Sequence, residues 1–297
     1  MYGVSKLNQK STSVFVDNSE EKLGIGSGII LTSNGFILSN YETTGLKGET
    51  CFVTLKNGSI YPAEVKWVDE NLDISIIKIS IENLLCLQMG DSNNIEIGDR
   101  LYLLSNSIGY DLNENLIETI ISKAKTTLKI VNDTKIIYAE DIIKISNDIL
   151  KEYNGGAILN KNGELLGIAS NKLNSVVPIN RIKNILNRLK EDENFEEPYL
   201  GIYGFDNNVL KYLIDDYNLK LGIYVEKVEE DSPAFEKVFQ GDIITKIDDY
   251  ELSSFEELIE YLYLKNPQEI VNLTILRGIK QININIILKK SHPTSSM

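Results

Sequence analysis

Short apolar runs separated by turn residues are the feature that most limits what the first half of this chain can fold into. Asn-Gly, Lys-Asn-Gly and Gly-Asp turns stand between the runs from Val14 to about Ser170. Short strands at such spacing are typical of an all-β sandwich or barrel. The sequence therefore predicts a β domain, with strands at residues 28–31, 35–38, 52–55, 74–79, 100–104, 116–122, 158–159 and 165–169.

An amphipathic helix is predicted over residues 179–190. Its apolar positions 182, 185, 186 and 189 follow the i, i+3, i+4, i+7 spacing of one helix face. A charged bridge over residues 191–197 comes next and ends at Pro198. Since 297 residues are usually enough for two domains, we predict a first domain over residues 1–193, a second over 194–290 and a tail over 291–297.

Composition excludes some classes of function. The formal net charge is −13, from 43 acidic against 30 basic residues, so the chain repels polyanions and nucleic-acid binding is not expected. Hydrophobic content of 42% and charged content of 25% are those of an ordinary globular protein. No run of 18 apolar residues occurs and the start of the chain is polar. The sequence as given therefore predicts no export signal and no membrane span, and the compartment stays open.

Cys51 and Cys86 are the only cysteines, and each lies inside an apolar run. Two cysteines without metal-ligand spacing are most often buried thiols. We expect both to be buried and free, and a disulfide between them is left open.

Three segments resemble the catalytic motifs of HtrA-type (DegP-like) serine proteases. Residues 152–159, Glu-Tyr-Asn-Gly-Gly-Ala-Ile-Leu, and the hairpin that follows resemble the family's Gly-Asn-Ser-Gly-Gly-Pro-Leu segment. Residues 26–42 are similar to the hairpin that leads to the catalytic histidine, and residues 71–79 to the strand that follows the catalytic aspartate. The resemblance places Glu42 at the histidine, Asp73 at the aspartate and Asn154 at the nucleophilic serine.

The residues at these positions predict that the catalytic site is lost. An amide nitrogen shares its lone pair with the carbonyl, so no ordinary base makes Asn154 a nucleophile. The only histidine in 297 residues is His292, in the tail, which leaves Asp73 no imidazole to orient. The resemblance also places Glu152 at a glycine whose N–H helps form the oxyanion hole, where a side chain and a carboxylate are both unfavourable.

The second half of the chain resembles a PDZ domain. A strand at 222–228 is followed by Ser-Pro-Ala at 232–234, Gly-Asp-Ile-Ile at 241–244, a helical pattern at 255–264 and a strand that ends in Arg-Gly at 277–278. The two resemblances cover about Val14 to Leu288 in the HtrA order. They imply an all-β dominated fold, a trypsin-like double β-barrel followed by an α+β PDZ domain.

The resemblance assigns peptide binding to the segment Tyr199-Leu200-Gly201-Ile202. In PDZ domains of this family such a loop receives a terminal carboxylate on free backbone N–H groups, and the next strand pairs with the peptide. Leu258 and Leu262 are predicted to line the groove from a helix, and the alternative that they pack in the core stays open. The acidic surroundings favour neutral or basic peptides.

A new site built from Glu42, Asp73 and Asn154 is not expected. Divalent cations in oxygen sites usually need about six ligands, and no Asp-rich loop occurs. We therefore predict no metal and no cofactor. If the two carboxylates lie close together, their repulsion should raise one pKa.

The favoured hypothesis is a catalytically inactive HtrA-like pseudoprotease that binds peptides, unfolded chains or protein C-termini, in bacterial protein quality control or as a regulatory or scaffold subunit. Two alternatives stay open: an active serine endopeptidase with a rearranged site, and a structural subunit without peptide binding. The resemblance implies homo- or hetero-oligomers, commonly trimers through N-terminal aromatic residues, for which Tyr2 and Phe15 are available.

Overall fold

The computed structural model describes residues 13–17, 25–106, 114–132, 135–206 and 222–290. Tyr2 and the predicted tail with His292 therefore lie outside the described residues. The chain divides into two compact units, Met1–Leu189 and Lys190–Met297. Each unit is described by itself.

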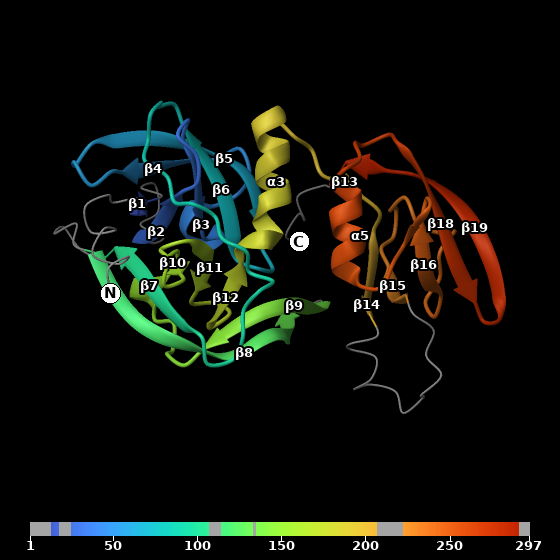
Figure 1. The fold of residues 1–297 in the computed structure, drawn as a ribbon. Helices are drawn as coiled ribbons and strands as arrows, with labels where there is room; N and C mark the ends of the chain where they lie inside the picture. The colour runs from blue at the N-terminus through green and yellow to red at the C-terminus, as the bar shows by residue number, and fades with distance from the viewer. Residues whose placement is uncertain (1–12, 18–24, 107–113, 133–134, 207–221, 291–297) are drawn as a thin grey trace. The chain divides into compact units, whose positions relative to one another are not determined.

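The first unit holds two closed β-barrels (Figure 1). The first barrel has the strand order β1-β2-β3-β6-β5-β4, and the second has the order β10-β11-β12-β9-β8-β7. The strands of the first barrel are β1 Ser13–Asp17, β2 Ile25–Ile30, β3 Phe36–Ser39, β4 Thr50–Thr54, β5 Ile60–Asp69 and β6 Ile74–Ile79. Those of the second are β7 Arg100–Asn106, β8 Glu114–Asn132, β9 Lys135–Ile145, β10 Ala157–Leu159, β11 Leu165–Ser170 and β12 Ser175–Pro178.

Each barrel is filled by branched aliphatic side chains that alternate with outward residues along the strands. The first core includes Val16, Ile37, Val53, Val65 and Ile77, all inaccessible to solvent. The second includes Leu101, Leu103, Ile121, Ile158 and Val176. The predicted strands are confirmed.

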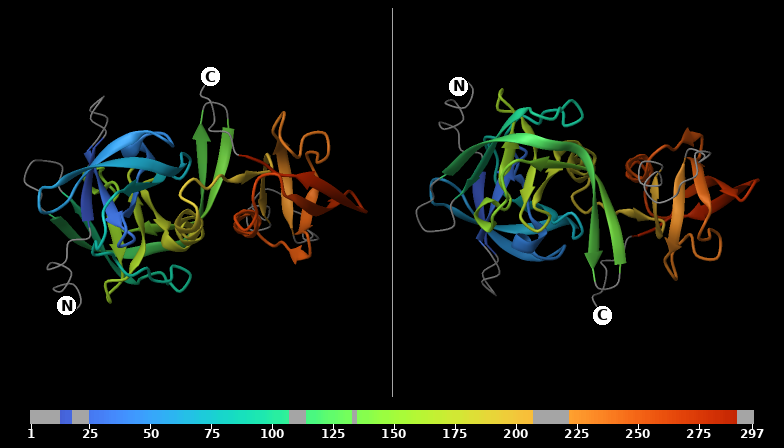
Figure 2. Two further views of the ribbon diagram at one scale, coloured as in Figure 1. Left: turned by 90° about the horizontal axis from the view of Figure 1, so that it is seen from above. Right: turned by 90° about the horizontal axis from the view of Figure 1, so that it is seen from below.

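Three short helical elements complete the unit: α2 Tyr41–Thr44, the 3-10 turn η1 Lys151–Tyr153, and α3 Ile179–Glu191. α3 confirms the predicted helix, and its predicted apolar stripe is buried. α2 carries the position assigned to the catalytic histidine, and the position assigned to the serine, Asn154, directly follows η1. The hairpin of β8 and β9 is much longer than the predicted strand at 116–122, and its outer part extends beyond the second barrel (Figure 2).

The second unit is a sheet with the order β14-β15-β16-β18-β19, a small strand β17 beside β16, and a separate pair of β13 with β20. The bounds are β13 Pro198–Tyr199, β14 Ile202–Asp206, β15 Ile223–Val228, β16 Ile243–Ile247, β17 Tyr250–Glu251, α5 Phe255–Leu262, β18 Ile270–Arg277, β19 Lys280–Ile287 and β20 Lys289–Lys290. Ser254 caps α5 by accepting a hydrogen bond from Glu257 N (3.1 Å). One apolar core joins the sheet to α5.

One prediction about the cysteines is wrong. Cys51 is buried in the first barrel, as expected, but Cys86 is exposed, and neither forms a disulfide. The apolar run around Cys86 belongs to no strand, and its neighbour Leu85 is also exposed. A run of apolar residues predicts burial only where a strand or helix directs it toward a core.

Candidate functional site

Asp73 lies at the centre of the candidate site and is completely buried. Its backbone has φ +53°, a left-handed conformation that aspartate tolerates better than most residues. The Oδ1 atom accepts a hydrogen bond from Glu42 N (3.0 Å). The Oδ2 atom accepts one from Ser170 Oγ (2.9 Å) and one from Asn40 Nδ2 (3.2 Å). Three neutral donors from two segments, residues 40–42 and Ser170, therefore hold a buried carboxylate.

The pKa of Asp73 is raised from 3.8 to about 6. Burial is the largest cause, because it penalises the charged form. The hydrogen bonds from Glu42 N–H and Ser170 oppose the rise, and the charge of Glu42 adds to it. Repulsion between the carboxylates was expected from the sequence, but it is a lesser cause than burial.

Glu42 lies on α2, a helix of four residues. Its backbone N–H contacts Asp73, while its side chain is exposed. Within the described part of the chain, no hydrogen bond joins the Glu42 carboxylate to Asp73 or Asn154. The structure therefore brings the backbone of position 42 to Asp73 without forming a new acid–amide cluster.

Asn154 follows η1 and is 9% exposed. Its carbonyl oxygen accepts a hydrogen bond from Ser27 N (3.0 Å), which connects it to the first barrel. Gly155 has φ +77°, and a Cβ at that position would lie 2.0 Å from Ser27 O. A side chain has no room there, so glycine is required for the chain to turn from η1 into β10.

The backbone N–H of Asn154 is not available to a substrate. It donates to Lys151 O (3.1 Å), and Tyr153 N donates to Leu150 O (2.9 Å), so both amides close the 3-10 turn. An oxyanion hole needs preorganised donors aimed at the developing charge. Glu152, at the other position assigned to this hole, is exposed in the same turn.

Three asparagines fasten the segment 148–154 to the segment 171–174, and we call Asn154, Asn171 and Asn174 the asparagine ladder. Asn154 Oδ1 accepts from Asn171 N (2.9 Å), and Asn171 Nδ2 donates to Ile149 O. Asn174 Oδ1 accepts from Ile149 N (2.8 Å), and Asn174 Nδ2 donates to Asp148 Oδ1 (3.0 Å). The residue at the nucleophile position thus forms part of a structural clamp.

Replacing Asn171 by alanine is expected to loosen this clamp. Asn171→Ala removes the donor to Ile149 O, at a cost of about 1 kcal/mol in the free energy of unfolding. Hydrogen exchange of the amides at 149–154 should accelerate by about fivefold if they exchange by local opening. Asn162→Ala, in an exposed hairpin turn, is the control. Unchanged exchange in Asn171→Ala would contradict the clamp.

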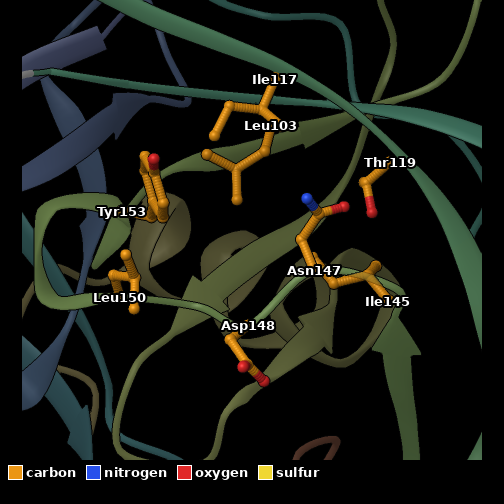
Figure 3. Close-up of a pocket in the computed structure, with 8 residues that line it drawn as sticks. All are labelled: Leu103, Ile117, Thr119, Ile145, Asn147, Asp148, Leu150 and Tyr153. Atoms are coloured by element: carbon orange, nitrogen blue, oxygen red, sulfur yellow. The ribbon is translucent and has the colours of Figure 1, made fainter.

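A pocket of about 310 Å³ adjoins η1 through Leu150 and Tyr153 (Figure 3). Leu103, Ile117 and Ile145 line it with Thr119, Asn147 and Asp148. Among these lining residues, Asp148 is the only carboxylate, and none is a histidine, cysteine or lysine. The pocket therefore offers space beside the turn but no set of groups for acid–base chemistry.

The predicted carboxylate-binding loop lies between β13 and β14. Gly201 has φ +76°, and a Cβ there would lie 2.0 Å from the Cβ of Ser232. No described residue accepts a hydrogen bond from the N–H of Leu200 or Gly201, although the carbonyl oxygens of both accept hydrogen bonds, from Ala234 N and Glu229 N. Two free donors in a tight turn form an arrangement that binds anions.

Two tyrosines lie beside this loop. Tyr199 and Tyr203 both donate to Glu229 Oε2, the second at 2.6 Å. Burial, and then the hydrogen bond to Glu229, raises the pKa of Tyr199, so its phenol stays a donor. The sequence did not single out Tyr203 or Glu229, because residues that meet across a strand pair carry no local motif.

β14 is an edge strand, paired with β15 on one side, and α5 lies near it (Figure 1). Leu258 and Leu262, predicted to line a groove, are 2% and 8% exposed in the core of this unit. Their burial favours the core-packing alternative, and a role in binding stays a prediction. Phe255 and Ile259 are the more exposed apolar residues of the helix.

The described residues contain no group of three or more histidine, cysteine, aspartate or glutamate side chains arranged to hold a metal ion. Within the same residues, no helix has both the length and the apolar character needed to cross a membrane.

Family models and relatives agree on the organisation of the chain. Residues 26–168 match the trypsin-like peptidase domain, and residues 198–288 match the PDZ domain. The serine endoprotease DegS of Haemophilus influenzae is 25% identical over 97% of this chain and 84% of its own length. The serine protease Do-like HtrA of Lactococcus lactis subsp. cremoris is 27% identical, over 90% and 71%. The periplasmic serine endoprotease DegP of Escherichia coli K12 is 27% identical, over 91% and 58%.

Solved structures show the same fold. The serine endoprotease from Yersinia pestis has a TM-score of 0.65 at 24% identity, covering 96% of this chain and 97% of that one. The HtrA-type protease AlgW, solved with a tripeptide, has a TM-score of 0.73 at 21% identity, covering 98% and 97%. The fold prediction of a trypsin-like double barrel followed by a PDZ domain is confirmed. The chain belongs to the HtrA-like family, in which a trypsin-like peptidase domain precedes a PDZ domain.

Proposed function

We propose that this chain is a catalytically inactive HtrA-like protein that acts by binding peptides or protein C-termini through its PDZ domain. The observation that carries the proposal is the side-chain chemistry of the triad positions. The chain has one histidine, His292, far along the sequence from the site, and an amide at position 154. Without an imidazole and a hydroxyl, the acyl-transfer mechanism of this fold has neither base nor nucleophile.

The geometry of the site supports inactivity. Asp73 accepts from Glu42 N–H, Ser170 and Asn40 rather than from an imidazole. Asn154 is held in the asparagine ladder, and its N–H is bonded to Lys151 O. Asp73 and Asn154, at two of the three triad positions, therefore both have other partners within the fold.

An active endopeptidase with a rearranged site is the alternative that the names of the relatives favour, since they are serine proteases. Ser39, Ser105 and Ser146 are its candidate nucleophiles. Ser39 Oγ donates to Ser27 O, Ser105 is completely buried, and Ser146 Oγ is bonded to Thr119 and Asn147. Labelling of any of them by a fluorophosphonate, or casein cleavage that survives Asn154→Ala, would overturn the proposal.

Peptide binding is supported by the free N–H groups of Leu200 and Gly201 beside β14, the terminal strand of the sheet among the described residues. AlgW was solved with a tripeptide and with a decapeptide. We propose that the ligand is an extended peptide that ends in a free carboxylate, with neutral or basic side chains because the chain carries a net charge of −13. The role would be regulatory, scaffolding or protein quality control.

Amidating the C-terminus of a bound peptide is expected to weaken its affinity by at least about tenfold, because charge-assisted hydrogen bonds from two amides are lost. Gly201→Ala should abolish binding, because its Cβ clashes with Ser232. Gly278→Ala is the matched control, since Gly278 also has positive φ but nothing lies within 4 Å of an added Cβ. Fluorescence anisotropy measures affinity, and circular dichroism checks each fold.

A purely structural subunit is the remaining alternative. A screen against a library of peptide C-termini decides between it and the proposal. No binder in the screen, or binders whose affinity is unaffected by amidation, would refute the peptide-binding proposal and leave the inactivity of the peptidase domain as a separate result.

A further inference from the structure

β19 is the other edge strand of the sheet in the second unit. It pairs with β18 over eight residues, from Ile270↔Ile287 to Arg277↔Lys280, and within the described residues no strand pairs with its outer side. Figure 1 shows β19 at the outer border of this sheet. A free strand edge is a template for pairing with another chain.

The register identifies which backbone groups are free. Leu288 N donates to Glu269 O (2.9 Å), one step beyond the Ile270↔Ile287 pair. Hydrogen-bonded and non-bonded pairs alternate along an antiparallel ladder, so the even-numbered residues of β19 bond to β18. The outward N–H and C=O groups are those of Gln281, Asn283, Asn285 and Ile287.

This edge lacks the charges that usually prevent strand pairing. Residues 281–287, Gln-Ile-Asn-Ile-Asn-Ile-Ile, contain no charged residue and no proline. Lys280 and Lys289 lie at its two ends. The described side chain that bonds to the outer edge is Lys237, whose Nζ donates to Asn285 O (3.2 Å). Lys237 is exposed, so an incoming strand can displace it.

The edge is complementary to itself. An antiparallel copy centred on Ile284 places Asn283 opposite Asn285, Gln281 opposite Ile287, and Ile282 opposite Ile286. The outward N–H and C=O groups of one copy then face those of the other copy. No like charges lie opposite each other, because Lys280 lies opposite Leu288. We infer that β19 pairs with β19 of a second copy in this register, which joins the two sheets across a two-fold axis.

The asparagine side chains fit this pairing. Thr274 Oγ1 donates to Asn283 Oδ1 (3.1 Å), and Asn272 Nδ2 donates to Asn285 Oδ1 (2.8 Å). These bonds fix the amide oxygens toward β18 and leave the Nδ2 groups as donors for the facing copy. Stacked asparagines between paired strands are a known stabilising arrangement. The register centred on Asn285 is disfavoured by charge, because it would place Lys280 opposite Lys290.

Disulfide trapping tests both the partner and the register. Asn283→Cys and Asn285→Cys are made separately in the full chain with exposed Cys86 replaced by serine. After mixing the two variants with a mild oxidant, we expect a covalent dimer to form at least about tenfold faster than in either variant alone, because opposite Cα atoms about 5.5 Å apart suit a disulfide. Cross-linking at these positions detects only the contact between two β19 strands, whatever other assembly the chain forms.

Asn162→Cys, on an exposed turn of the first unit, supplies the rate of random collision. The inference would be overturned if the mixture cross-links no faster than this control. It would also be overturned if Asn283→Cys or Asn285→Cys alone cross-links faster than the mixture. Circular dichroism confirms that each variant is folded. The peptide-binding proposal concerns β14 and is unaffected by either result.

Discussion

The double variant Glu42→His/Asn154→Ser is expected to react with a fluorophosphonate at least about 100-fold more slowly than the triple variant that also carries Glu152→Gly, because one missing oxyanion donor costs about 10²–10³ in rate. Glu42 N–H already contacts Asp73, so an imidazole introduced at position 42 starts beside its orienting carboxylate. The remaining obstacle is the turn at 151–154, in which Asn154 N bonds to Lys151 O. Glycine at 152 gives the backbone the freedom to turn its N–H outward.

A further variant, Glu42→His/Glu152→Ala/Asn154→Ser, separates the two effects of Glu152. Alanine removes the carboxylate and keeps the Cβ, so this variant stays slow if backbone freedom decides and recovers if charge repulsion decides. Labelling by the probe, followed by mass spectrometry of the modified peptide, measures the reactivity of all three variants. Equal labelling of the double variant and the Glu152→Gly triple variant would show that position 152 is not an obstacle.

Much of this molecule follows from local sequence patterns. The apolar runs at 74–79 and 165–169 are strands. Alternating apolar residues indicate a strand with one face in a core, and a short continuous apolar run indicates a strand buried on both faces. The stripe of 182, 185, 186 and 189 becomes the buried face of α3. Positions 42 and 73 were assigned by motif resemblance, and the structure places the backbone of the first within hydrogen-bond distance of the carboxylate of the second.

Other features depend on partners that are distant in sequence. Ser170, at the end of β11, and Asn171, directly after it, contact Asp73 and Asn154, 97 and 17 residues away. The asparagine ladder therefore cannot be predicted from a local sequence pattern. Cys86 was expected to be buried because its neighbours are apolar, but the segment lies outside the barrel strands. Burial is set by the path of the chain, and an apolar run alone does not define that path.

Asp73 connects this site to stability, and Asp73→Asn is expected to change how the fold responds to pH. The pKa of Asp73 is about 6 in the folded chain against an ordinary 3.8. Between these pH values the folded state binds more protons than the unfolded state, so the free energy of unfolding falls as pH rises. The ionised carboxylate thus destabilises the fold fully above about pH 6 and not at all below about pH 4.

Asparagine at 73 keeps the left-handed backbone accessible and an acceptor for Glu42 N–H, but it does not titrate. Relative to Asp73→Asn, the native chain should therefore gain about 3 kcal/mol when pH is lowered from about 7 to about 4, since each pKa unit corresponds to about 1.4 kcal/mol. Urea unfolding followed by the fluorescence of Trp67, the single tryptophan and a buried residue of β5, measures the first unit.

Comparing two variants isolates this group from the many other carboxylates that titrate in the same range. Glu82→Gln, which removes an exposed carboxylate of the same unit, is the control. A stability difference between Asp73→Asn and the native chain that stays constant with pH would mean that Asp73 is ionised in the folded chain down to its ordinary pKa. The hydrogen bonds from Glu42, Ser170 and Asn40 would then balance the effect of burial on the pKa of Asp73. That balance decides whether Asp73 is still suited to orient an imidazole, because this role needs an ionised carboxylate, and position 42 carries a glutamate in place of the histidine.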